Sequence, residues 1–236
     1  MNPNRRTAIV VGVLYIIGTV AGILSVSITR SILQAPDYLM KVSTNGNQVI
    51  IGALFVLIMG FALAMVPVMM FPILKKQNEA LALGYVVFRG GLETVTYMIS
   101  TISWLLLPIL GLEFAKEGAP ASSSLQTLGT LLLGTADRGA LMTIFVFGLG
   151  ALIFYTLLFQ SKLVPRWISI WGLIAIAMHL ITGLLIIFGW TSAFSQLVVF
   201  MDIPIAIQEM VMAVWLIIKG FDPSAIPFAL ATVEIN

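Results

Sequence analysis

Residues 88–100 read FRGGLETVTYMIS and carry ionisable side chains inside one of the most hydrophobic stretches of the chain. Arg89, Glu93 and Tyr97 recur at intervals of four residues, so on an α-helix they share one face. A charge at the centre of a bilayer costs roughly 2.5–3.5 kcal/mol on insertion scales, so such residues face the protein interior or a water-filled cavity. This stripe is therefore the first candidate for a functional site.

Two later hydrophobic segments contribute three more ionisable residues. His179 lies near the middle of the segment 167–188, and Asp202 and Glu209 lie two helical turns apart on one face of the segment 194–218. At about 1.5 Å per residue, all three reach depths close to that of the first stripe. We therefore predict one polar intramembrane pocket, with the ligand-binding residues Arg89, Glu93, Tyr97, His179, Asp202 and Glu209.

The predicted pocket contains more acid than base. Three carboxyl groups face one arginine and one histidine, so a carboxyl is protonated, water fills the site, or a cation binds. The leading hypothesis is a membrane protein that binds or transports a small amphipathic or cationic ligand.

Two alternatives remain open. One is a lipid- or prenyl-modifying intramembrane enzyme, in which His179 and either Glu209 or Asp202 form an acid–base pair. The other is a structural or accessory membrane subunit, because buried ion pairs can simply fix helix packing.

Composition excludes several classes of protein. The chain is 60% hydrophobic and 9% charged, with a mean hydropathy of +1.08, so it has too little polar surface for a soluble protein and is expected to be an integral membrane protein. The basic residues are scattered, which does not favour nucleic-acid binding. The chain has no cysteine and one histidine, and no HExxH pattern, so no metal ligands are assigned. Catalytic residues and cofactors remain unknown.

Apolar runs predict an all-α fold, a bundle of six transmembrane helices that forms one domain over residues 1–236. We also predict a short extracytoplasmic interfacial helix at Leu125–Leu133, before the fourth span. The six predicted spans cover about residues 8–29, 49–74, 80–107, 140–159, 167–188 and 194–218.

The distribution of lysine and arginine predicts the orientation. The flanks on one side carry Arg5, Arg6, Lys75, Lys76, Lys162, Arg166 and Lys219, whereas those on the other carry Arg30, Lys41, Lys116 and Arg138. The richer side is expected to be cytoplasmic, which places both termini inside. The expected partners are membrane lipids and a small-molecule ligand, with an oligomer possible.

Four short motifs resemble a bacterial six-span family known as domain of unknown function 4386. They are Arg5-Arg6-Thr7-Ala8, Phe88-Arg89 with Glu93, the loop Ser161-Lys162-Leu163-Val164-Pro165-Arg166, and Glu209 followed by Trp215-Leu216 and Lys219-Gly220. The resemblance covers nearly the whole chain and implies six helices in a bacterial cytoplasmic (inner) membrane. It draws attention to Arg89, Pro165, Arg166 and Glu209. It implies no reaction, because the family has no established chemistry.

Overall fold

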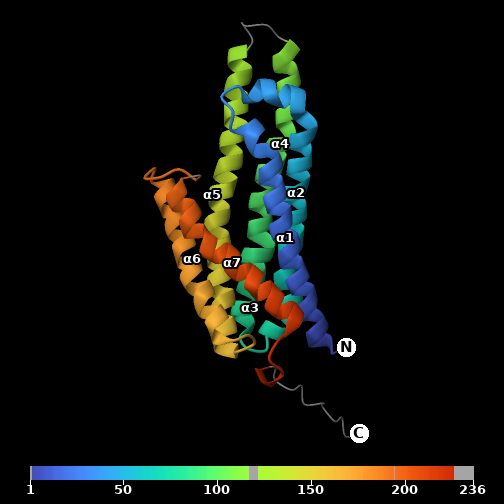
Figure 1. Ribbon diagram of the computed structural model, residues 1–236, viewed down its shortest axis with the longest axis vertical. Helices are drawn as coiled ribbons and strands as arrows, with labels where there is room; N and C mark the ends of the chain where they lie inside the picture. Colours follow the sequence, from blue (N-terminus) through green and yellow to red (C-terminus); the bar gives the residue numbers. More distant parts are fainter. Residues whose placement is uncertain (1, 117–121, 194, 226–236) are drawn as a thin grey trace.

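The computed structural model describes residues 2–116, 122–193 and 195–225, and the regular elements in these ranges are all helical (Figure 1). They are α1 (Pro3–Leu33), α2 (Tyr38–Leu74), α3 (Glu79–Tyr85), the π-helix η1 (Val86–Leu92), α4 (Glu93–Lys116), α5 (Ser122–Ser161), α6 (Arg166–Ile187), α7 (Gln196–Ile218) and the short 3-10 helix η2 (Pro223–Ala225).

Within the described residues, six helices are long and apolar enough to cross a membrane. They confirm the predicted all-α, six-span architecture, with α3, η1 and α4 together forming the third span. Large apolar side chains project outward from every span, for example Ile23, Phe61, Ile102, Leu149, Ile174 and Ile218. Such a surface suits hydrocarbon rather than water, so the chain is a multi-pass membrane protein.

The helices of the first four spans extend beyond the predicted ranges, because hydropathy marks only the apolar centre of a helix. α2 has 37 residues and α5 has 40, whereas about 20 suffice to cross the hydrocarbon core. The prediction of a short interfacial helix at Leu125–Leu133 is wrong, because these residues belong to the first turns of α5. The polar residues Asp137 and Arg138 do not interrupt the helix, since both are exposed on its surface.

A bend occurs instead at the start of the second span. Asn45 has the non-helical backbone angles φ −123° and ψ 29°, and its side-chain Nδ2 donates a hydrogen bond to the Lys41 carbonyl (2.9 Å). The short helical segment before Asn45 therefore runs in a different direction from the rest of α2. Figure 1 shows this bend at the end of the bundle opposite the N-terminus.

The spans form a ring in sequence order. Each span packs against the next, and α7 packs against both α6 and α1, which closes the ring. Figure 1 shows α7 running obliquely across the bundle from α6 towards the N-terminal end of α1. The crossing of α1 and α7 is close, because a Cβ at Gly12 would lie 2.6 Å from the Ala213 carbonyl oxygen. η1 lies between α2 and α5, which places Arg89 inside the bundle.

Candidate functional site

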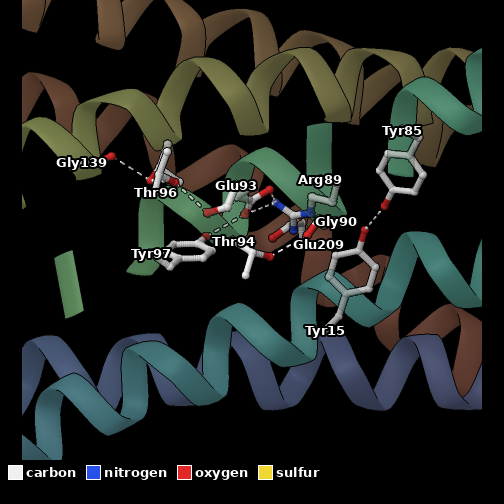
Figure 2. Close-up of polar contacts among 11 residues, drawn as sticks. Tyr15, Tyr85, Arg89, Gly90, Glu93, Thr94, Thr96, Tyr97, Gly139 and Glu209 are labelled. Atoms are coloured by element: carbon white, nitrogen blue, oxygen red, sulfur yellow. Dashed lines mark hydrogen bonds and ion pairs between the residues drawn. The ribbon is translucent and has the colours of Figure 1, made fainter. Parts of the chain in front are cut away.

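Arg89 is the centre of a buried cluster that joins two spans (Figure 2). Its Nη1 donates to both carboxylate oxygens of Glu93, at 2.9 and 3.0 Å, and its Nη2 donates to Oε1 of Glu209 on α7 at 3.1 Å. The planar guanidinium can donate in several directions at once, which a lysine ammonium cannot reproduce with the same geometry. One arginine therefore connects the third span to the sixth.

The π-helix η1 presents Arg89 from a locally loosened backbone. The amide of Glu93 bonds to the Phe88 carbonyl five residues back, which is the π-helical pattern. A hydroxyl satisfies one backbone acceptor in this region, because Thr94 Oγ1 donates to the Gly90 carbonyl (2.7 Å). A Cβ on Gly90 would lie 3.4 Å from Pro67 Cγ, an ordinary van der Waals contact, so α2 packs directly against this turn. Single π-turns inside α-helices are frequent at functional sites.

The two glutamates of the cluster differ in how fully they are hydrogen-bonded. Glu93 is completely buried and accepts a further bond from the Tyr97 hydroxyl at 2.7 Å. Glu209 keeps 15% of its side chain exposed, and among the described residues Arg89 is its one hydrogen-bond donor. Two carboxyl groups thus share one guanidinium, and Glu209 is the one with acceptor capacity left for a further group.

Aromatic rings surround the Arg89 guanidinium. Its Cζ lies 4.3 Å from the centroid of Phe147 on α5 and 5.9 Å from that of Tyr15 on α1. The Tyr15 hydroxyl lies 3.4 Å from that of Tyr85, and Figure 2 shows the two hydroxyls directed towards each other. Ring faces attract cations through their quadrupole, so this wall suits positive charge. Sequence reasoning did not identify Phe147, because one phenylalanine in an apolar helix carries no signal.

His179 and Asp202 form a second polar group between α6 and α7. His179 Nδ1 lies 2.9 Å from Asp202 Oδ1, and Thr182 Oγ1 lies within hydrogen-bond distance of the same oxygen (3.2 Å). Phe147 contacts a member of each group, since its ring is 5.3 Å from the His179 ring and 4.3 Å from the Arg89 guanidinium. The six predicted site residues therefore form two neighbouring hydrogen-bonded groups, with Phe147 close to both. Their role in ligand binding remains a prediction.

Gln208 is a buried polar residue that sequence reasoning missed. Its Oε1 accepts a bond from the Tyr155 hydroxyl at 2.6 Å, and its Nε2 donates to the Ile168 carbonyl at 3.0 Å. Gln208 thereby connects α7 to α5 and α6, next to the Arg89 contact of Glu209. The sequence did contain a signal for Gln208, because an amide side chain within an apolar membrane helix needs hydrogen-bond partners inside the protein.

The described residues contain no group of three or more histidine, cysteine, aspartate or glutamate side chains placed to hold a metal ion. The carboxyl groups near Arg89 are instead occupied by hydrogen bonds from the guanidinium and from Tyr97. This arrangement can retain a proton or accept a cationic group at Glu209.

Comparison with known proteins places the chain in a family. A family model described as a domain of unknown function, DUF4386, matches residues 10–220. The chain belongs to this family. Neither the curated proteins nor the solved structures provide a match.

The DUF4386 match extends from α1 to the end of α7 and so encloses both polar groups. Arg5, which contacts the last carbonyls of α7, lies before it. Membership of this family assigns no reaction, so the geometry of the DUF4386 bundle is the guide to its function.

We expect the stability of the protein to depend both on the charge of Arg89 and on the forked shape of its guanidinium. Arg89→Ala leaves two carboxyl groups without their shared donor, and breaking a buried pair in this way costs about 3–5 kcal/mol. Arg89→Lys keeps the charge but cannot reach Glu93 and Glu209 with the same geometry, so we expect an intermediate loss. Unfolding of protein in lipid nanodiscs measures both. The exposed control Arg138→Ala should change little, and equal stability of Arg89→Ala and this control would contradict the assignment.

Proposed function

We propose that the cluster around Arg89 is a binding site for a small cationic ligand with an apolar body. The proposal rests on the excess of negative charge at Glu209. Glu93 and Glu209 share the single guanidinium of Arg89, and Oε2 of Glu209 accepts no hydrogen bond from the described residues. A positively charged group at this oxygen would balance the cluster.

The surroundings support both halves of this ligand. The rings of Phe147 and Tyr15 lie 4.3 and 5.9 Å from the Arg89 guanidinium, so the cluster has aromatic walls of the kind that stabilise positive charge. The rest of α7 is strongly apolar, which favours a ligand that partitions into the membrane. A hydrophilic cation would have to leave water at a high cost.

Asp202 and His179 are the proposed entry to the site. Asp202 lies on the same face of α7 as Glu209, about 10 Å away along the helix. Its side chain is 31% exposed, against 15% for Glu209 and 3% for Arg89, so exposure decreases towards the buried cluster. An approaching cation would therefore meet carboxyl groups at two successive depths.

Binding of matched organic ions tests the proposal. Tetraphenylphosphonium and tetraphenylborate have similar shapes and opposite charges, and binding of each to the protein is measured as the excess over empty nanodiscs, because the two ions partition differently into lipid. In nanodiscs we expect the phosphonium to bind, and Glu209→Gln to weaken it about tenfold or more, because an interaction with a charged group contributes about 1.5–3 kcal/mol. The exposed Glu113, which pairs with Lys116, provides the control Glu113→Gln.

Equal binding of the two ions, or equal affinity of Glu209→Gln and Glu113→Gln, would contradict the proposal. Independently of these ions, native mass spectrometry of protein purified gently from its own membrane would identify the class of the natural ligand. A bound species that is present in the wild type and absent from Glu209→Gln is the expected result.

A second candidate function is a lipid- or prenyl-modifying enzyme, and one observation favours it. Asp202 holds Nδ1 of His179 at 2.9 Å, an arrangement that fixes the imidazole and leaves Nε2 for proton exchange. Turnover of membrane lipid that His179→Gln abolishes and Glu209→Gln preserves would favour this enzyme over the binding protein. A role restricted to structure, as an accessory subunit, would show neither turnover nor ligand binding.

We also propose that the protein lies in a bacterial cytoplasmic membrane with both termini inside. The basic residues at the ends of α1, α2 and α7 support this orientation. Because the chain has no cysteine, a single introduced cysteine reports on which side of the membrane its position lies. In intact cells, a membrane-impermeant maleimide should label Ser123→Cys and not Ser224→Cys, and the reverse pattern would contradict this topology.

A further inference from the structure

An apolar groove runs along the outside of the bundle between α1 and α7. Its volume is about 650 Å³, and its lining includes Thr19, Ile23, Ala206, Met210, Val214 and Lys219. Ile207 and Val214 project from the face of α7 directed away from Glu209, so the groove is separate from the cluster around Arg89.

The crossing of α1 and α7 explains why a groove forms here. The helices touch at Gly12, where a Cβ would also lie 2.7 Å from Ile217 Cγ1. Beyond this point they diverge, as Figure 1 shows, and no other span lies over the gap on the lipid side. Thr19 and Ala206, each seven residues beyond the contact of Gly12 with Ala213, line opposite walls of the widening part.

The groove is long enough to hold an acyl chain from one leaflet of a bilayer. Its α7 wall extends from Ala206 to Lys219, which is about 20 Å along the helix axis. Half of the hydrocarbon core is about 15 Å thick, so an acyl chain fits this wall with its headgroup near Lys219. Trp215 also lines the groove near this end, where tryptophan commonly marks the level of the headgroups.

Charge at this end of the groove favours an anionic headgroup. Lys219 is exposed and has no carboxylate partner among the described residues. The C-terminal carbonyls of α7 would repel a phosphate, but Arg5 donates to the carbonyls of Leu216, Ile217 and Ile218 and so offsets their negative charge.

We propose that this groove binds an anionic phospholipid from the leaflet at the Lys219 end, which the sequence predicts to be cytoplasmic. The acyl chain lies along the lipid-facing side of α7, its far end reaches the gap beside Thr19 and Ile23 of α1, and the phosphate contacts Lys219. The proposal goes beyond the ligand site at Glu209, since the lipid occupies the opposite face of α7. It requires neither a cationic ligand nor the cluster around Arg89.

Competition between lipids of different charge tests the site. Purified protein would be equilibrated with phosphatidylglycerol or phosphatidylcholine carrying identical acyl chains, and bound lipid counted by native mass spectrometry. We expect phosphatidylglycerol to be retained preferentially, and Lys219→Gln to weaken its binding about fivefold, as for one basic residue at a membrane surface. Lys76→Gln removes an equal charge from the same predicted side, away from the groove, and should have no such effect.

A steric variant tests the apolar half independently. Ala206 is exposed in the groove, so Ala206→Phe should fold normally and displace the acyl chain without changing charge. We expect it to reduce retention of phosphatidylglycerol as Lys219→Gln does. Equal retention of the two lipids by the wild type, or equal losses in Lys219→Gln and Lys76→Gln, would overturn the proposal. So would a dimer that Ala206→Phe converts to monomers, because the groove would then hold a second copy of the chain.

Discussion

A guanidinium inside a membrane must find all its partners within the protein, and Arg89 imposes this requirement on the bundle. Water is absent from the hydrocarbon core, so each hydrogen-bond donor left alone there would cost several kcal/mol. Glu93 supplies partners from the same span, whereas Glu209 must be brought from α7. The π-turn at η1 and the oblique path of α7 are the local features through which the chain meets this requirement.

α7 separates two kinds of environment. Its inner face carries Gln208 and Glu209, whose side chains connect it to three other spans, while its outer face borders the apolar groove along α1. Because one face of α7 makes a few specific polar contacts and the other faces lipid, a change on either face can shift the position of this helix. The binding site proposed at Glu209 and the lipid site proposed at Lys219 would therefore act on the same helix.

The sequence predicted those features that depend on local spacing. Apolar runs identified the six spans, and the four-residue interval between Arg89 and Glu93 anticipated their contact. Depth along the helices placed Glu209 near Arg89, but it could not reveal that Phe147 contacts both Arg89 and His179, because helix rotation and neighbours are set by packing. The unbroken course of α5 was missed since a polar patch at Asp137 and Arg138 resembles the end of a helix.

Arg89 and Glu209 hold the third span and α7 together through one charged hydrogen bond. A double-mutant cycle tests it most directly, with the unfolding free energies of Arg89→Ala, Glu209→Gln and the double variant measured in nanodiscs. We expect Glu209→Gln to cost at least about 1 kcal/mol less when Arg89 is already absent, within the range seen for residues in contact. Costs that add to within about 0.3–0.5 kcal/mol would show two independent residues and contradict the account.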